Sequence, residues 1–352
     1  MDITPELSET HYFETNLPPS TLAEHTALAN AFVKQHHDAK RPVVLLTSGG
    51  TTVPLENQTV RFIDNFSAGT RGATSAEYFL SHGYAVIFLH RQFSLLPFSR
   101  HYSHSTNCFL DFLSEWGRIG EDEEDGGKAE QAATPDVVVK AKYRQEMLSV
   151  LRKYQEAKKK NLLLLLPFTT VTSYLFTLKA LACEMQCLGN EALFYLAAAV
   201  SDFFVPPSRM AEHKIQSGDI PSLGSDGSGV GGGGGKKLIV DLDPVPKFLK
   251  RLVEQWAPQA MIVSFKLETD PQMLLSKCRQ SLERYSHHLV IGNLLSTRKR
   301  EVVFVDREGV EWIRTPDAGQ DSEEVEIESL IVPAVIRKHQ EMLQRRKTGD
   351  KK

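Results

Sequence analysis

The sequence predicts an α/β fold: a three-layer α/β/α, Rossmann-like sandwich built around a mostly parallel sheet. Short apolar runs alternate along the chain with longer segments in which apolar residues recur at helical spacing. The runs are apolar at consecutive positions, as expected for strands that are buried on both faces of a sheet. Near the C-terminus, "EVVFVD" and "VEWIRT" flank a Glu-Gly turn, which predicts an antiparallel hairpin.

The elements follow one another in a regular order. "PVVLLTS" (42–48) predicts the first strand, which stops at Gly49-Gly50. A helix is expected from Gly72 to Gly83, because small or apolar residues recur there at helical spacing and glycine commonly ends a helix. Further strands are expected at 84–90, 162–167, 193–199, 261–266 and 288–293, and further helices at 143–158, 173–188, 245–256, after Asp270-Pro271 and at about 323–345.

Two segments of biased composition interrupt this alternation. An acidic stretch at about 117–136 and a glycine-rich stretch at 217–237 predict flexible insertions. The second is expected at the tip of a hairpin, here called the flap, with arms near 213–216 and 238–243; an ordered phosphate loop is the alternative. The predicted boundaries are an N-terminal extension (1–40), a single domain (41–346) and a tail (347–352).

Composition points to a soluble protein of the cytoplasm, without deciding whether it also enters the nucleus. The 352 residues are 41% hydrophobic and 24% charged, and the net charge of −3 gives no reason to expect binding to nucleic acid or an anionic membrane. The longest apolar run, "LLLLLPF", is far shorter than the roughly 20 residues that a bilayer requires. The acidic N-terminus lacks the apolar region of a secretory signal, and four scattered cysteines do not form a disulfide framework.

Ligands of open parallel sheets bind at the carboxyl ends of the strands, where the chain carries Gly49-Gly50-Thr51-Thr52. Glycines there let a ligand approach the backbone closely. The segment is not a P-loop, because no lysine follows it, and there is no G-x-G-x-x-G with an acidic residue about 20 positions on. Taken alone, it fits a plain strand-to-helix turn equally well.

The stretch "RFIDNFSAGTRG" (61–72) leads directly into a predicted helix, whose free N–H groups and dipole favour an anion. Ser67 adds a hydroxyl donor, and Asn65 can both donate to a carbonyl oxygen and accept from an amide. Arg61 and Arg71 either neutralise phosphate or lie in solvent.

A third polar segment, "LAAAVSDFFVP" (196–206), follows a predicted strand. Its three alanines leave room for a ligand, and Asp202 supplies an acceptor; a tight helix–strand contact with an N-cap is the alternative. Lys214 lies at the base of the predicted flap, where it either contacts an anion or is solvated.

These stretches occur together with "VPK" and "SFKLETD" (264–270) in one order and spacing. From about Pro42 to Asn293, the chain resembles the eukaryotic phosphopantothenoylcysteine synthetases, the second enzyme of coenzyme A synthesis from pantothenate. The two insertions are departures from that pattern.

The resemblance implies a reaction. The family activates the carboxylate of 4′-phosphopantothenate with a nucleoside triphosphate, which gives an acyl-nucleotidate and pyrophosphate; the cysteine amine then displaces the nucleotide. Such chemistry needs charge neutralisation and positioning more than a protein nucleophile.

The resemblance also implies roles for individual residues. Asn65, expected on the acyl carbonyl, Lys214 and Lys266 are the implied catalytic residues, although the flap of the bacterial relatives is richer in lysine than "HKIQ" here. Asn65, Ala198, Ala199 and Asp202 are implied to bind phosphopantothenate, and Gly49, Ser67, Gly69, Gly72, Phe265 and Asn293 to bind the nucleotide.

The implied nucleotide is ATP, with CTP as the alternative, accompanied by Mg²⁺ that the triphosphate carries without a dedicated protein site. The residues before Pro42 are too few for the flavin-dependent decarboxylase fused to many prokaryotic members, so no flavin is expected. The family is dimeric, with the flap reaching across the interface.

Two other function classes compete with this reading. A nicotinamide-dependent oxidoreductase is disfavoured, because no carboxylate follows the second strand in "LHRQFS". A non-catalytic, synthetase-like subunit that binds nucleotide in an assembly or regulatory role is the remaining alternative. The sequence leaves open the role of the insertions, feedback regulation and membership of a larger biosynthetic complex.

Overall fold

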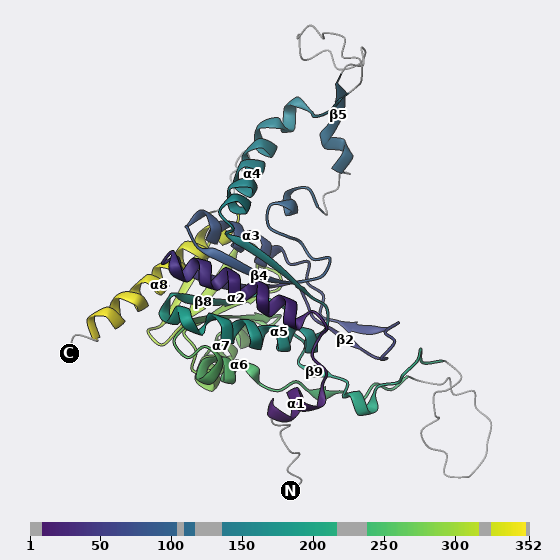
Figure 1. Ribbon diagram of the computed structural model, residues 1–352. Coiled ribbons are helices and arrows are strands. Elements are labelled where there is room, and N and C mark those ends of the chain that lie inside the picture. Colours follow the sequence, from purple (N-terminus) through teal and green to yellow (C-terminus); the bar gives the residue numbers. More distant parts are fainter. Residues whose placement is uncertain (1–8, 104–108, 117–135, 217–237, 317–324, 350–352) are drawn as a thin grey trace, which may run out of the picture.

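The computed structural model describes residues 9–103, 109–116, 136–216, 238–316 and 325–349. An eight-stranded sheet with the order β14-β13-β12-β11-β8-β1-β4-β7 forms its centre (Figure 1). The six strands from β12 to β7 are parallel, and β13 and β14 add an antiparallel hairpin, so the predicted fold class is confirmed. The strands are β1 (Val43–Ser48), β4 (Ala85–Arg91), β7 (Leu163–Phe168), β8 (Ala192–Leu196), β11 (Met261–Glu268), β12 (Leu289–Leu294), β13 (Glu301–Val305) and β14 (Val310–Arg314).

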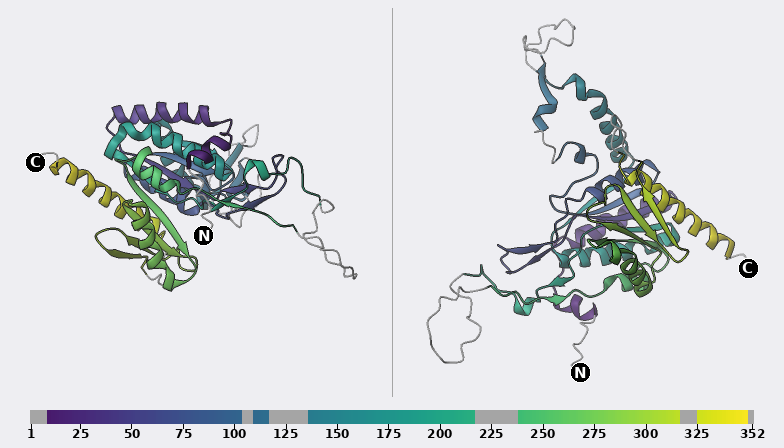
Figure 2. Two further views of the ribbon diagram at one scale, coloured as in Figure 1. Left: turned by 90° about the horizontal axis from the view of Figure 1, so that it is seen from below. Right: turned by 180° about the vertical axis from the view of Figure 1, so that it is seen from behind.

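Helices cover both faces of the sheet, which gives the three layers that the sequence predicts (Figure 2). One face lies under α2 (Leu22–Asp38), α5 (Val171–Glu184) and α7 (Pro271–Tyr285), and the other under α3 (Thr70–Ser81) and α8 (Glu328–Gly349). Alternate residues of β1 point into the two cores, as a period of two requires: Val43 and Leu45 into one, Val44 and Leu46 into the other.

The segment from residue 9 to residue 38 packs against the domain rather than extending from it. Tyr12 of α1 (Glu9–Thr15) and Ala29, Phe32 and Val33 of α2 are buried in the same core as Val43 and Leu45 of β1. Buried positions three and four apart are the stripe by which a helix packs onto a sheet. These residues precede the domain boundary predicted at residue 41.

Smaller elements surround the sheet. The hairpin β2 (Thr52–Pro54)–β3 (Phe62–Asp64) follows β1. The helix α4 (Ala141–Lys159) projects from the body beside the antiparallel pair of β5 (Leu113–Trp116) and β6 (Asp136–Val139) (Figure 1). Both predicted insertions lie outside the described residues, apart from Asp136. The remaining elements are β9 (Phe203–Phe204), β10 (Asp243–Pro244), α6 (Phe248–Arg251), a short π-helix at Leu252–Trp256, and 3₁₀ helices at Ser99–His101, Phe109–Phe112, Met185–Glu191 and Pro207–Arg209.

Among the described residues, the strand β7 forms an open edge of the sheet. The carbonyls of Leu162 and Phe168 accept from the N–H groups of Val86 and Gln92 beside β4, so even-numbered positions of β7 face β4. Pro167 therefore faces outward. No helix in the described part of the chain is both long and apolar enough to traverse a lipid bilayer.

Candidate active site

The loops after β1 and β8 are joined by backbone hydrogen bonds at the carboxyl edge of the sheet. Ala199 N–H donates to the Gly49 carbonyl at 2.8 Å, and Thr51 N–H donates to the Ala199 carbonyl at 3.0 Å. The N–H of Ala198 donates to Thr47 Oγ1 at 3.1 Å. This pairing brings the glycine segment and the alanine segment, which are about 150 residues apart, into one site.

Close packing explains the glycines of this edge. Gly49 has a φ of +83°, and a Cβ atom there would lie 2.7 Å from Arg91 Cβ. A Cβ atom at Gly72, in the first turn of α3, would overlap the side chain of Ser48. Glycine at position 72 lets the first turn of α3 lie directly against the end of β1, and glycine at position 49 lets the loop after β1 lie against the end of β4.

The start of α3 is arranged to receive an anion. Gly69 is the N-cap with a φ of +83°, and no side chain caps the helix, so its first N–H groups stay available to a ligand. Ser48 Oγ donates to the Gly69 carbonyl at 3.1 Å, which fixes the turn, and Ser67 Oγ accepts from Gly69 N–H at 3.4 Å. Ser67, Gly69 and Gly72 thus lie together, as the sequence predicts.

Asn65 lies beside this phosphate-type site. Its N–H donates to the Thr51 carbonyl at 3.1 Å, and Thr51 N–H in turn donates to Ala199. The two backbone groups of Thr51 therefore join the Asn65 segment to the alanine segment. A carboxylate held by Ala198, Ala199 and Asn65 would lie next to an anion at the start of α3.

Phe265 and Asn293 lie on the same face of the sheet as α3. Phe265 on β11 is paired in register with Ile291, whose side chain is in the core under α3 and α8, and Asn293 lies two positions further along β12. The Phe265 ring packs edge-on against Tyr195, with centroids 5.0 Å apart. Asn293 is buried, and within the described residues its side-chain amide has no hydrogen-bond partner.

Lys266 points to the opposite face of the sheet. Strand alternation directs it, like its register partner Gly292, toward the core beneath α7, and its Nζ lies 3.6 Å from Glu268 Oε1. The structure therefore separates Lys266 from Phe265 and Asn293, which the sequence grouped with it in one ligand site.

Lys214 is exposed on a segment that is docked against the turn after β2. Asn57 N–H donates to the Ala211 carbonyl at 2.9 Å, and Ile215 N–H donates to Glu56 Oε1 at 3.3 Å. Asp202 is also exposed, at the base of the same flap, where its carbonyl accepts from Val245 N–H at 2.8 Å. The predicted flap pairs at β9–β10, closer to the sheet than the arms expected at 213–216 and 238–243.

The two arginines offered as phosphate ligands have protein partners. Arg61 Nη1 lies 2.9 Å from Glu56 Oε1 and donates to the Ile215 carbonyl. Arg71 Nη1 lies 2.9 Å from Glu328 Oε1. Glu56 is fully buried, and hydrogen bonds from backbone N–H groups, that of Arg61 foremost, hold the pKa of its carboxyl below the usual value.

Sequence reasoning missed several residues that shape the site. Glu56, Ser48, Tyr195 and Glu328 each hold a predicted site residue or its segment in place. The available signal was the position of Ser48 and Glu56 on either side of the Gly49–Thr52 segment.

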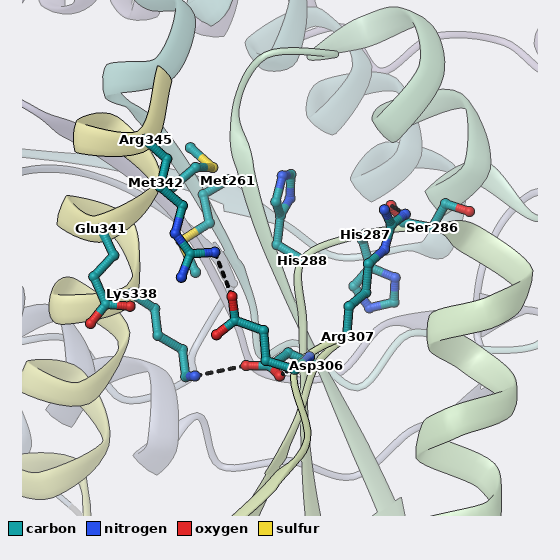
Figure 3. Close-up of a pocket in the computed structure, with 11 residues that line it drawn as sticks. Met261, Ser286, His287, His288, Asp306, Arg307, Lys338, Glu341, Met342 and Arg345 are labelled. Atoms are coloured by element: carbon teal, nitrogen blue, oxygen red, sulfur yellow. Dashed lines mark hydrogen bonds and ion pairs between the residues drawn. The ribbon is translucent and has the colours of Figure 1, made fainter. Parts of the chain in front are cut away.

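A charged pocket lies at the opposite, amino-terminal end of the parallel strands. It is lined by Met261 at the start of β11, the loop 286–288 and the side chains of α8 (Figure 3). Lys338 Nζ lies 2.7 Å from Asp306 Oδ2, and Arg345 pairs with Glu308, so its charges neutralise one another. This pocket is separate from the glycine-rich edge. Among the described residues, no cluster of three or more His, Cys, Asp or Glu side chains could hold a metal ion.

Fold and site together define a Rossmann-like α/β protein in which the uncapped start of α3, the glycine segment after β1 and the alanine segment after β8 meet at the carboxyl edge of the sheet. No protein-family model matches the chain. It is 52% identical over 349 residues to phosphopantothenate–cysteine ligase CAB2 of Saccharomyces cerevisiae. The match covers 97% of this chain and 88% of that protein. It is 41% identical over 303 residues to the human phosphopantothenate–cysteine ligase, with 85% of this chain and 86% of that protein covered.

A solved structure of a Cab2 variant in complex with phosphopantothenate-cysteine superimposes with a TM-score of 0.79 at 49% identity, over 96% of this chain and 99% of that one. A pantothenate-metabolism flavoprotein from Streptococcus pneumoniae, 18% identical with a TM-score of 0.50, shares the fold. The chain belongs to the phosphopantothenate–cysteine ligase family.

Proposed function

We propose that the protein ligates 4′-phosphopantothenate to L-cysteine in coenzyme A biosynthesis, using a nucleoside triphosphate, most favourably ATP. A carboxylate oxygen attacks the α-phosphorus, and the bond to the pyrophosphate leaving group breaks. The cysteine amine then attacks the acyl carbon of the acyl-nucleotidate, so that an amide forms and the nucleoside monophosphate and a proton leave.

The pairing of Gly49 with Ala199 is the observation that carries this proposal. The loop after β1 is thereby joined to the small residues Ala198 and Ala199, pairs with Asn65 through Thr51, and contacts the uncapped start of α3 through Ser48, and an uncapped helix start favours phosphate. An acyl-nucleotidate needs this adjacency, because the carboxylate and the α-phosphate must meet in line. The family relation over nearly the whole chain supports the same reaction.

Each predicted site residue receives a role in this proposal. Gly49, Ser67, Gly69 and Gly72 hold the phosphates, while Phe265 and Asn293 contact the base and ribose. Asn65 donates to the acyl carbonyl, and Ala198, Ala199 and Asp202 bind phosphopantothenate. Lys214 neutralises the charge that develops on phosphorus. Lys266 takes part only if its amine leaves Glu268 and reaches around the end of β11.

Mg²⁺ fits the site as a companion of the triphosphate. The edge offers hydroxyls, backbone N–H groups and the exposed carboxylate of Asp202, which suits an ion that keeps water and phosphate as its ligands. When bound, the ion would neutralise phosphate charge, and Asp202 is the side chain that could hold it.

A homodimer and a cytoplasmic location complete the proposal. Large apolar side chains are exposed on β2–β3 and beside the flap; Phe66 is 88% exposed. An exposed apolar patch marks an interaction surface, and the family relation favours a second copy of the chain. The other exposed apolar residues there are Val60, Phe62, Ile63, Phe203, Leu238, Ile239 and Val240.

Pyrophosphate release by the purified protein tests the proposal. Phosphopantothenate and Mg²⁺ are supplied with ATP or CTP, with and without L-cysteine. We expect release that requires phosphopantothenate, with the monophosphate and the cysteine conjugate appearing only after cysteine is added. Folded protein that binds nucleotide but releases no pyrophosphate would instead be the non-catalytic subunit.

A further inference from the structure

Arg71, the second residue of α3, joins three elements that are distant in the sequence. Its Nη1 lies 2.9 Å from Glu328 Oε1 in the first turn of α8, and its Nη2 donates to the Arg298 carbonyl at 2.6 Å. Arg298 belongs to the turn that follows β12, five residues after Asn293. One guanidinium therefore fixes α3, the turn at 295–300 and the start of α8 relative to one another.

The same guanidinium also lies over an aromatic ring. Arg71 Cζ is 6.0 Å from the centroid of Phe265, within the range of a cation–π contact. On its other side Phe265 packs edge-on against Tyr195, whose hydroxyl lies 3.0 Å from Ser75 Oγ on α3. Two contacts, both anchored on α3, thus orient the Phe265 ring.

This arrangement is buried and electrically balanced. The side chains of Arg71 and Glu328 are 17% and 11% exposed. Burial raises the pKa of the Glu328 carboxyl and the Arg71 charge opposes that rise, so each charge needs the other. The planar guanidinium of Arg71 donates to the Glu328 carboxylate and to the Arg298 carbonyl, so it holds these two partners at a fixed spacing.

We propose that Arg71 is a positioning residue for the nucleotide. The start of α3 receives the phosphates, whereas Phe265 and Asn293 receive the base and ribose, so one ligand must span both parts. Arg71 sets the spacing between them before the ligand arrives. The inference rests on the proposed function, since it assigns the nucleotide to these residues.

Direct binding measurements test the role without turnover. The Kd of a non-hydrolysable ATP analogue with Mg²⁺ is measured by calorimetry for the wild type, Arg71→Lys and Glu328→Gln, together with the Kd of phosphopantothenate. Lysine keeps the charge but cannot hold Glu328, the Arg298 carbonyl and the ring together. We expect the analogue Kd of Arg71→Lys to rise at least tenfold, and the phosphopantothenate Kd to stay within twofold.

Arg100 supplies a matched control. It is also buried beside α3, 12% exposed, and pairs with Glu77 and Glu326 at 2.8 and 2.6 Å, but among the described residues no cation–π contact joins it to Phe265. Arg100→Lys should lower the melting temperature about as much as Arg71→Lys and leave the analogue Kd within twofold.

A double-mutant cycle identifies the route of the effect. If Arg71 acts through the ring, Arg71→Lys should change the analogue Kd much less in a Phe265→Leu background. An unchanged Kd in folded Arg71→Lys, or an equal rise in Arg100→Lys, would overturn the positioning role. Wild-type protein that binds the analogue but releases no pyrophosphate would overturn the ligase proposal and leave this one standing.

Discussion

Gly50 and Asn65 approach each other so closely that a Cβ atom on Gly50 would overlap the backbone oxygen of Asn65. The loop after β1 and the segment that carries Asn65 are therefore in direct backbone contact. Any side chain at position 50 must push that segment away from the site.

Gly50→Ala should lower the rate of pyrophosphate release at least 100-fold, because a misplacement of about 1 Å in a reacting group costs about that much. The rate at saturating substrates measures it. Gly309→Ala is the control, since a Cβ atom there meets open space and should change the rate less than twofold. An active Gly50→Ala variant would show that Asn65 tolerates displacement.

The two candidate lysines should differ in effect. Lys214→Ala should lower the single-turnover rate of pyrophosphate release about 100-fold, through loss of charge stabilisation at phosphorus. Lys266→Ala should lower it less than tenfold, because Lys266 faces α7 and pairs with Glu268. Equal losses in both variants would mean that Lys266 leaves its partner and reaches the triphosphate.

Glu56 holds the segment that carries Lys214, so its loss should weaken the flap. Its carboxylate accepts from the N–H groups of Val60, Arg61 and Ile215. We expect Glu56→Gln to lower the melting temperature and to raise the KM for phosphopantothenate, while the nucleotide Kd is unchanged. Because the folded-state pKa of Glu56 is lowered, its stabilisation is present above the usual glutamate pKa and is lost as pH falls through the lowered value.

His287 should make stability depend on pH. It is 1% exposed, its Nε2 lies 2.7 Å from Ser264 Oγ, and burial lowers its pKa to about 4. Between pH 6.5 and 4 the unfolded chain binds a proton that the folded protein does not, so stability falls as pH falls through that window. Between pH 6.5 and 5, the unfolding free energy of His287→Gln should therefore fall by about 2 kcal/mol less than that of the wild type.

Denaturant titrations at the two pH values measure this difference. The exposed His82 provides the comparison, and His82→Gln should leave the slope of the wild type unchanged. A His287→Gln variant with the slope of the wild type would mean that other buried groups carry the pH dependence.

Most of the sheet could be predicted from the sequence, because its strands are consecutive apolar runs. β1 was expected at 42–48 and lies at Val43–Ser48, and the hairpin β13–β14 lies where "EVVFVD" and "VEWIRT" predict it. The glycine-rich edge could also be predicted, since a close backbone approach restricts residue type locally.

Contacts between distant residues could not be predicted in this way. The helix α2 lies in a segment assigned to an extension, although Ala29, Phe32 and Val33 have the spacing of a buried stripe. The pair Arg71–Glu328 joins residues 257 apart, and no periodic pattern encodes such a partner. Phe265 and Lys266 point to opposite faces of the sheet because side chains alternate along a strand. Both residues were assigned to the ligand site from the sequence without considering this alternation.

The outward position of Pro167 has a consequence for the protein at high concentration. β7 is a leucine-rich strand at an open edge, the kind of strand on which another chain can add and start aggregation. A strand that docks there finds no N–H donor at Pro167, so the added ladder would be interrupted near its end. Pro167 thus limits the addition of further strands to the sheet at its β7 edge.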